Sequence, residues 1–279
     1  MLVTTDDLLT VAQRSGYAVG AFDLVSLETA MALLEAAESL RSPIILMVGQ
    51  EVWALVPHPV LIPAIRQMAE AASVPVAIIL DHGMSYEEVV VAIESGATSV
   101  MIDGSQLPFD ENVLLTQRVV KLAREAHVSV EAEIGHVGEG DPEFDALTTS
   151  LLSEPDDVER FLELTGVDAL AVAIGTVHGS YRGRPRLDFA RLQAIRARVD
   201  VPLVLHGGSG TRSEDLRHCI ELGISKINIY TDLELAARRE LRASLDHGDD
   251  LPAWLRAINR GFAEVAAEYL TLFGCAGRA

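Results

Sequence analysis

The feature that most constrains the fold of this 279-residue chain is a regular alternation of short apolar runs with longer segments of helical spacing. In segment 27–40, for example, Leu27, Ala30 and Leu34 fall on one helical face. This alternation is typical of parallel strands, since each parallel connection has to cross the sheet and a helix can cover that distance. Eight such units predict one closed (β/α)8 TIM barrel, which we expect to fill residues 1–279 as a single domain.

The predicted elements follow one another without a linker or a low-complexity tract. Strands are predicted at Tyr17–Phe22, Pro43–Val48, Ala77–His82, Thr98–Ile102, Val128–Glu133, Ala169–Ala173, Leu203–Leu205 and Ile224–Asn228. Helices are predicted after them at 27–40, Pro59–Ala72, Ser85–Ser95, Phe109–Ala126, Pro155–Thr165, Phe189–Val199, Ser213–Leu222 and Leu233–Leu245. An N-terminal helix, Thr5–Arg14, comes first, capped by Thr4 or Thr5. An extra amphipathic helix, from Pro252 to about Leu272, ends the chain.

The composition argues against several classes of partner. The formal net charge of −19 would repel phosphodiester backbones and anionic lipid, so we expect neither nucleic acid nor a membrane as partner. The first residues lack the basic region of a signal peptide, and no apolar stretch reaches the length of a membrane span, so we expect a cytoplasmic protein. Cys219 and Cys275 are too few and too far apart for a disulfide framework or a thiolate metal site.

Three predicted strands lead into a histidine followed by glycine: His82, His178 and His206. Because the C-terminal ends of barrel strands meet at one mouth, these histidines can converge, and three imidazoles with one open position are typical of catalytic zinc. The alternative is that each histidine only satisfies local hydrogen bonds. Other polar residues are expected at the same end, namely Asp23, Asp81, Asp103, Glu133 and Asn228.

A glycine-rich turn after the seventh strand indicates a phosphate site. Residues 207–211 precede a helix that Ser213 can cap, which turns backbone N–H groups and a helix N-terminus toward the barrel mouth. Residues 228–231 follow the eighth strand. Loops after strands 7 and 8 are where barrels commonly hold phosphate.

The segment 134–153 breaks the alternation. It is rich in glycine and acidic residues and longer than an ordinary βα loop. A long irregular loop after a barrel strand predicts a lid over the mouth.

Taken together, these motifs resemble the class II, zinc-dependent ketose-bisphosphate aldolases, in particular the fructose- and tagatose-bisphosphate branch. The resemblance runs in order from residue 1 to about residue 240. The segments that carry it are Gly20–Phe22, Leu80–Gly83, Ser99–Ser105, Val130–Gly135, Val172–Gly179, Leu205–Gly210 and Lys226–Asn228.

The resemblance implies a role for each matching position. It makes His82, His178 and His206 the ligands of one Zn²⁺, and Asp81 the acid/base at the hydroxyl of the cleaved bond. Asp103 and Glu133 match positions that support the metal ligands or form a second or alternative metal position. A monovalent cation, Na⁺ or K⁺, is expected near the phosphate. A small-molecule sugar phosphate is the expected partner, in a homodimer or homotetramer. Dihydroxyacetone phosphate is expected to contact Gly179, Gly207, Gly208, Ser209, Asn228 and Thr231.

The chemistry suits these residue types. Cleavage of a ketose phosphate to dihydroxyacetone phosphate and an aldehyde requires an enediolate, which zinc can stabilise, and a base such as Asp81 for the hydroxyl proton. A further acid moves the carbon-bound proton. An ungapped comparison of the lid places Asp141 there, with Glu139 and Glu143 as alternatives.

Departures from the family pattern concern the substrate. Asp23 adds a negative charge near the expected substrate where the family usually has asparagine, and Gly49, Glu51 and Trp53 offer no hydroxyl where a serine or threonine usually helps to bind the aldehyde's phosphate. The aldehyde partner is therefore expected to differ from glyceraldehyde 3-phosphate and can lack phosphate. The arginines that follow His178–Gly179, Arg182 and Arg184, are either contacts for an anionic group or solvated charges.

Two other functions remain open from the sequence. Lys226 shares strand parity with Asn228, so a Schiff-base aldolase is one alternative, although it would leave the three histidines without a purpose. A non-catalytic sugar-phosphate binding protein on the same scaffold is the other.

Overall fold

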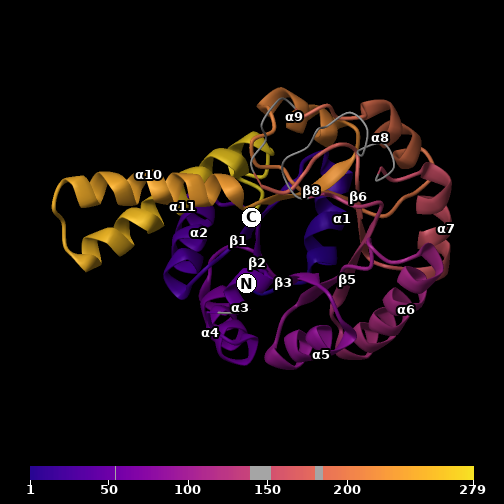
Figure 1. Ribbon diagram of the computed structural model, residues 1–279, viewed down its shortest axis with the longest axis horizontal. Coiled ribbons are helices and arrows are strands. Elements are labelled where there is room, and N and C mark those ends of the chain that lie inside the picture. Colours follow the sequence, from indigo (N-terminus) through magenta and orange to yellow (C-terminus); the bar gives the residue numbers. More distant parts are fainter. Residues whose placement is uncertain (54, 139–151, 180–184) are drawn as a thin grey trace.

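The computed structural model describes residues 1–53, 55–138, 152–179 and 185–279. It confirms the predicted (β/α)8 barrel: eight parallel strands close in sequence order, β8 pairs with β1, and a ring of helices surrounds them (Figure 1). The strands are β1 Val19–Asp23, β2 Ile44–Val48, β3 Val76–Gly83, β4 Ser99–Ile102, β5 Ser129–Ile134, β6 Ala169–Val172, β7 Leu203–Leu205 and β8 Ile224–Ile229.

The helices cover the outside of the barrel, and each predicted helix is found within a few residues of its expected bounds. They are α1 Thr5–Ser15, α2 Leu27–Ser39, α3 Gln50–Trp53, α4 His58–Ala71, α5 Tyr86–Ser95, α6 Phe109–Ala126, α7 Pro155–Thr165, α8 Phe189–Arg196, α9 Ser213–Glu221, α10 Thr231–Asp246 and α11 Leu251–Leu272.

Local sequence chemistry sets the helix ends. The hydroxyl of Thr4 accepts from the N–H of Asp7, whose carboxylate accepts from the N–H of Thr4, so α1 begins with a full capping box. Gly16 ends α1 in the left-handed conformation, at φ 69°. Asp250 caps α11, with a proline in its first turn. Each of these ends was predictable from residue type.

One local prediction was wrong, and one short element was missed. Ser213 does not cap α9: the cap position is Arg212, which makes no side-chain cap bond and whose guanidinium instead pairs with Asp215. The segment 50–53, which lies between the predicted strand Pro43–Val48 and the predicted helix Pro59–Ala72 and was assigned no element, forms the short helix α3. A single helical turn is too short for hydrophobic periodicity to reveal.

The N-terminal end of the barrel is closed by α1. Thr5 is the first residue of that helix. Its hydroxyl is hydrogen-bonded to the hydroxyl of Ser129 at 2.7 Å, and its N–H donates to the hydroxyl of Ser99 at 2.8 Å. Ser99 and Ser129 begin β4 and β5 and are hydrogen-bonded to each other at 2.8 Å. This buried hydroxyl cluster ties the helix to the start of the strands.

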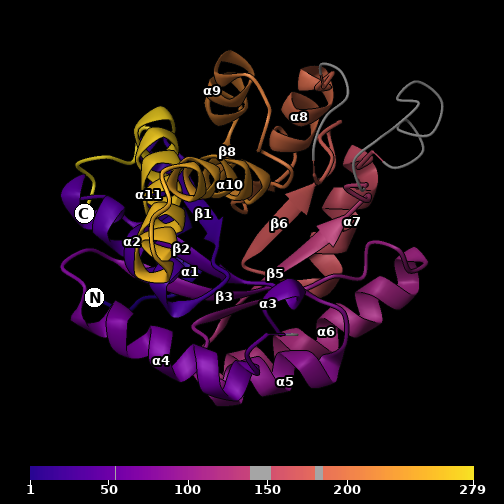
Figure 2. The ribbon, with the colours of Figure 1, turned by 60° about the vertical axis from the view of Figure 1, so that its left-hand side comes forward.

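The last two helices form an antiparallel pair that extends past the ring of helices (Figures 1 and 2). α10 packs along α11, and α11 also packs on α2 and β1. Large apolar side chains are exposed near the turn between them, at Leu245, Leu251 and Leu255. Among the described residues, no helix combines the length and apolarity required to cross a membrane.

Candidate metal centre and substrate cleft

A cleft of about 490 Å³ opens at the C-terminal ends of the strands. This is the end of a TIM barrel at which function is expected. Most of the sequence-predicted site residues line it: Asp23, Asp81, His82, Asp103, His178, Gly179, Gly207, Ser209, Asn228 and Thr231. Glu133 and His206 are fully buried beside them, within the same network of contacts.

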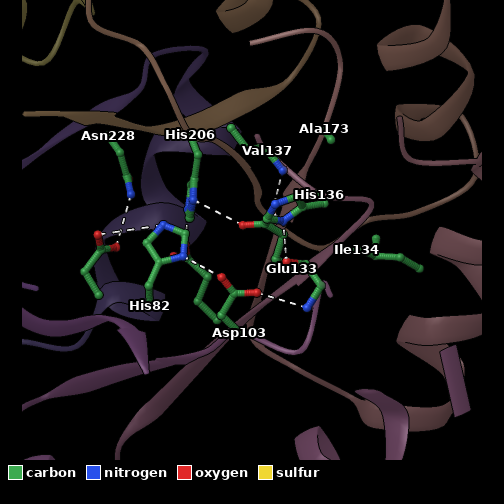
Figure 3. A network of polar contacts seen from close by, with 12 residues as sticks. His82, Asp103, Glu133, Ile134, His136, Val137, Ala173, His206 and Asn228 are labelled. Carbon is green, nitrogen blue, oxygen red and sulfur yellow. Dashed lines mark hydrogen bonds and ion pairs between the residues drawn. The ribbon is translucent and has the colours of Figure 1, made fainter. Parts of the chain in front are cut away.

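The three histidines come together as predicted. His82 lies at the end of β3, His178 after β6 and His206 directly after β7. One ring nitrogen from each lies within 4.8 Å of the other two. Figure 3 shows His82 and His206 side by side, with Asp103 and Glu133 next to them. A second group of converging donor atoms, from His82, Asp103 and Glu133, overlaps the first.

A β-bulge explains how neighbouring residues on β3 can both serve the site. In a regular strand Asp81 and His82 would point to opposite faces of the sheet. The pairing of β3 with β4 shifts between Leu80 and Gly83, and His82 has a positive φ of 46°. Bulges re-aim side chains next to functional sites, and a left-handed conformation at a histidine stores backbone strain. No residue pattern in the chain predicted this bulge.

Asp103 orients His82. Its Oδ2 lies 2.7 Å from Nδ1 of the imidazole, while its Oδ1 accepts from the N–H of Ser105 at 2.9 Å. Burial on its own lowers the pKa of His82. The charges of Asp81 and Asp103 outweigh that effect, and the pKa is raised to about 10. Burial raises the pKa of Asp103, whereas the contact with His82 lowers it well below its usual value. The ring is thus anchored through Nδ1, which leaves Nε2 to face the other histidines.

His206 is anchored through the opposite nitrogen. Its Nε2 lies 2.9 Å from Oε1 of Glu131, and its Nδ1 lies 3.3 Å from Oε2 of Glu133. Within the described part of the chain, neither Nδ1 of His206 nor Oε2 of Glu133 makes a hydrogen bond of normal geometry, although both atoms are buried. Burial lowers the pKa of His206, while its contacts with Glu131 and Glu133 raise it to a greater extent.

His178 completes the set as a neutral imidazole. Burial lowers its pKa to about 3, and nearby His206 and His82 contribute in the same direction. Its backbone N–H donates to the carbonyl of Gly138 at 2.8 Å, which links the loop after β6 to the loop after β5. Neutral imidazole is the form that binds a metal.

These donors fit a divalent metal ion. Buried polar atoms without hydrogen bonds need an explanation, and an ion is one of the standard explanations. Three imidazole nitrogens, oriented from behind by carboxylates at His82 and His206, match the pattern of catalytic zinc sites. His82, His178 and His206 could therefore hold the ion, and Glu133 could approach it as a further or alternative ligand.

Asp81 lies in the cleft beside His82 and Asn228. Its Oδ1 accepts a hydrogen bond from Nδ2 of Asn228 at 3.2 Å, and its Oδ2 lies 3.9 Å from Nε2 of His82. The residue is 7% exposed and lines the cleft. A carboxylate held by an amide beside the metal centre can exchange a proton with a ligand in the cleft.

The loops after β7 and β8 form the predicted glycine-rich wall. Gly207 has a φ of 66°, and a Cβ atom there would lie 2.3 Å from the carbonyl oxygen of Val177, so only glycine fits. The hydroxyl of Ser209 accepts from the N–H groups of Tyr230 and Asp232, at 3.2 and 3.3 Å, which fixes this loop to the start of α10. Gly208 lies behind the wall and its N–H donates to the carbonyl of Asn228, so its contact with substrate stays a prediction.

Several predicted residues lie outside the described residues. They include the three candidate lid acids and the two arginines: Glu139, Asp141, Glu143, Arg182 and Arg184. Of the lid, the structure describes only the beginning and the end. The two cysteines are described, and both are buried and free; burial raises the pKa of Cys219 to about 12.

Sequence reasoning missed other residues of the site. Glu131 had a usable signal, since it shares strand parity with Glu133 inside an otherwise apolar strand, and an acid in that position needs a partner. His136 lines the cleft and its Nδ1 lies 2.9 Å from the hydroxyl of Ser105. Glu234, on the first turn of α10, also lines the cleft. Neither His136 nor Glu234 follows a strand directly, which is why position alone did not reveal them.

Lys226 does not have the surroundings expected of a Schiff-base lysine. Its side chain is fully buried, and its Nζ lies 2.9 and 2.8 Å from the two carboxylate oxygens of Glu131. It is also not among the residues that line the cleft. A lysine that forms an imine must reach the substrate as a free amine, so this arrangement argues against the alternative.

The fold and the site together define a class of protein: a TIM-barrel enzyme in which three histidines converge beside a carboxylate at the barrel mouth. Comparison with known families then makes the assignment. The sequence model described as fructose-bisphosphate aldolase class-II matches residues 3–278. The chain belongs to this family, and the protein is accordingly an enzyme, a carbon–carbon lyase of the aldolase type.

Solved structures agree with this assignment. The YdjI aldolase from Escherichia coli K12 superposes with a TM-score of 0.90 at 34% identity, covering all of both chains. A putative fructose-1,6-bisphosphate aldolase from Coccidioides immitis gives 0.87 at 28% identity, covering 98% of this chain and 96% of that one. Fructose-bisphosphate aldolase from Campylobacter jejuni shares the fold, with a TM-score of 0.84 at 22% identity, covering 100% and 97% of the two chains.

Proposed function

We propose that this enzyme is a zinc-dependent aldolase that reversibly cleaves a ketose (bis)phosphate to dihydroxyacetone phosphate and an aldehyde. One observation carries the proposal: ring nitrogens of His82, His178 and His206 lie within 4.8 Å of one another, directly beside Asp81. The family assignment supports the aldol reaction, and the donor set supports zinc.

His82, His178 and His206 would hold the zinc ion, with Asp103 orienting His82 and Glu133 available as a second or alternative ligand. Zinc bound there would supply a Lewis acid that draws electron density from the ketone of the substrate. The rest of the chemistry belongs to the protein's own side chains.

Asp81 accepts the proton of the hydroxyl on the aldehyde side of the cleaved bond. As that hydroxyl becomes the aldehyde carbonyl, the electron pair of the carbon–carbon bond passes to the ketone half. Asn228, which donates to Oδ1 of Asp81, keeps the carboxylate in position and leaves Oδ2 for the proton. In the direction of synthesis the same proton returns from Asp81.

A second acid then delivers a proton to the carbon of the ketone half, and we assign this role to Asp141 on the predicted lid, with Glu139 and Glu143 as the alternatives. We expect dihydroxyacetone phosphate to contact Gly179, Gly207, Ser209, Asn228 and Thr231, because all of them line the cleft, and Thr231 begins α10, whose N-terminus favours an anion. Gly208, a monovalent cation near the phosphate, a homodimer or homotetramer and a cytoplasmic location remain expectations from the resemblance and the composition.

Proton exchange at C3 of dihydroxyacetone phosphate in D2O tests this function without knowledge of the aldehyde. We expect exchange with the purified protein, its loss after chelation, and recovery on adding zinc. Asp81→Asn serves as the matched variant: it should still exchange the C3 proton but fail to cleave ketose phosphate. Zinc-loaded protein that binds dihydroxyacetone phosphate without exchanging its proton would contradict the proposal.

The aldehyde partner is proposed to lack a phosphate. Asp23 and Glu234 place carboxylates on the cleft wall, and Gly49 offers no hydroxyl at the end of β2. Carboxylates disfavour a second phosphate by like-charge repulsion in a partly desolvated cleft. A panel of aldehydes with dihydroxyacetone phosphate tests this: unphosphorylated hydroxyaldehydes should give higher kcat/KM than glyceraldehyde 3-phosphate, and Asp23→Asn should narrow the difference. A clear preference for the phosphorylated aldehyde would reject this candidate.

A further inference from the structure

A buried ion pair crosses the barrel directly beneath the proposed metal centre. Glu131 on β5 and Lys226 on β8 lie on strands that are not neighbours in the barrel, yet Nζ of the lysine reaches both carboxylate oxygens, at 2.9 and 2.8 Å. Neither side chain is exposed to solvent. The layer that holds them is one that barrels usually fill with branched apolar side chains.

Stability alone does not explain this pair. Transferring two charges from water into a protein interior has a desolvation penalty of several kcal/mol per ion, and apolar residues of similar volume are often as stabilising. The hydroxyl cluster of Thr5, Ser99 and Ser129 shows that the same barrel can satisfy buried polar groups without charge. The ion pair therefore calls for a function.

A third contact of Glu131, with His206, indicates what this function is. Oε1, besides accepting from Lys226, lies 2.9 Å from Nε2 of His206, which is itself fully buried. The lysine ammonium is a hydrogen-bond donor and cannot accept. Glu131, which binds it through both oxygens as a carboxylate, can therefore act only as an acceptor. His206 must then donate its Nε2 hydrogen to Glu131.

We propose that Lys226 and Glu131 act as positioning residues that fix His206 in the Nε2–H tautomer and so present its Nδ1 as a metal ligand. This proposal rests on the metal centre of the proposed function. His206 offers one ring nitrogen to the group of three histidines, and Nε2 is already held by Glu131. Nδ1 makes no hydrogen bond of normal geometry among the described residues, so it is the nitrogen left for the metal. Carboxylates behind metal-binding histidines are known to set tautomer and ring orientation in this way.

Lys226 has a distinct part in this arrangement. Its ammonium bonds to both carboxylate oxygens of Glu131, at 2.9 and 2.8 Å, and so holds Oε1 in the orientation that accepts from Nε2 of His206. Without the ammonium the carboxylate is free to turn away from Nε2, and the hydrogen of His206 is no longer held on that nitrogen. The lysine thus acts on the metal site through two other side chains, and not on the substrate.

Three variants separate this role from a structural one: Glu131→Gln, Lys226→Met and the double variant. Each single change leaves one buried charged group without its partner and is expected to lower stability. The double variant removes both charges at nearly constant volume and is expected to fold, which keeps the test valid. An amide at position 131 can present either its oxygen or its NH2 group to His206, so it no longer selects one tautomer.

Two readouts other than activity apply to the double variant. We expect its zinc dissociation constant, measured by competition with a chromophoric chelator, to rise about 10- to 100-fold. In ¹⁵N-detected imidazole spectra of the zinc-loaded wild type, His206 should show a protonated Nε2 and a metal-bound Nδ1, and the double variant should lose this single pattern. Ser129→Ala is the matched control on the same strand: it should lower Tm and leave both readouts unchanged.

The outcomes discriminate between this inference and the proposed function. A folded double variant with wild-type zinc affinity and an unchanged His206 spectrum would overturn the positioning role, whatever the enzyme catalyses. Zinc bound through Nδ1 of His206 without proton exchange on dihydroxyacetone phosphate would reject the proposed function and leave the positioning role standing. A wild-type protein without zinc affinity would reject both.

Discussion

The two ends of the barrel bury polar side chains in opposite ways. At the N-terminal end, the hydroxyls of Thr5, Ser99 and Ser129 bond to one another at 2.7 and 2.8 Å and carry no charge. At the C-terminal end, Nδ1 of His206 and Oε2 of Glu133 are buried without hydrogen bonds of normal geometry in the described part of the chain. The backbone at His82 is strained as well.

This difference shows which end was shaped by function. A fully satisfied neutral cluster only has to hold α1 against the strands, and nothing about it asks for a ligand. Buried nitrogen and oxygen atoms without hydrogen bonds raise the free energy of the empty protein, and a cation bound by them would lower that of the loaded one. Variants at the C-terminal end should therefore change turnover, and variants at the N-terminal end should change the free energy of unfolding.

The largest effect is expected at the metal centre. His178→Ala removes one of the three proposed zinc ligands, so metal-dependent turnover should fall by several orders of magnitude, because a Lewis acid contributes several kcal/mol to the transition state. Thermal stability without metal should stay within a few degrees of wild type. Zinc content and kcat measured on the same sample check this, and wild-type turnover at a fraction of the zinc content would contradict it.

Asp81→Asn should produce the next largest effect. The amide keeps the contact with Asn228 but cannot take the hydroxyl proton, so kcat for cleavage should fall by about 10²- to 10⁴-fold. Zinc affinity should change little, since Asp81 is not among the converging donors of the three-histidine set. Steady-state cleavage kinetics with metal analysis of each preparation provide the test. Equal losses of zinc and of activity would assign Asp81 to the metal instead.

The reverse pattern is expected at the N-terminal end. Ser129→Ala leaves the hydroxyls of Thr5 and Ser99 each without one partner, which should cost about 1–3 kcal/mol of unfolding free energy. Because this cluster lies at the opposite end of the barrel from the cleft, kcat and KM should match wild type. Denaturant unfolding and kinetics check both halves, and a stable variant with altered kinetics would remove the distinction between the two ends.

A smaller effect is expected where Tyr269 on α11 lies near Gly210, in the glycine-rich loop after β7. The hydroxyl of Tyr269 donates to Oδ2 of Asp232 at 2.5 Å, and the same oxygen accepts from the N–H of Gly210 at 3.0 Å. Tyr269→Phe removes one net hydrogen bond, so KM for the ketose phosphate should rise about 2- to 10-fold with little change in kcat. An unchanged KM would show that Gly210 keeps its position without the tyrosine.

The sequence predicted the barrel and most of the cleft because both follow from periodic or terminal signals. Apolar runs and helical spacing located all eight strands, and a polar residue at a strand end identified His82 and His206. The convergence of the three histidines was predicted from residue type and the geometry of the barrel mouth, and the class of metal that they would bind stays a prediction.

What the sequence could not supply depends on register and on contacts across the barrel. The bulge that turns His82 into the site arises from the pairing of β3 with β4 and leaves no mark in the composition. The partnership of Lys226 with Glu131 joins residues 95 positions apart, so Lys226 was open to interpretation as a Schiff-base lysine. The error at Ser213 is of another kind, since several residue types can occupy a helix cap.

The most direct test of the metal centre is an anomalous difference map from crystals of zinc-loaded protein, collected at the zinc edge. The account predicts one ion at about 2.0–2.1 Å from a ring nitrogen of each of His82, His178 and His206, with Nδ1 as the ligand from His206. An ion held by Asp103 and Glu133 alone, or bound away from the cleft, would contradict it.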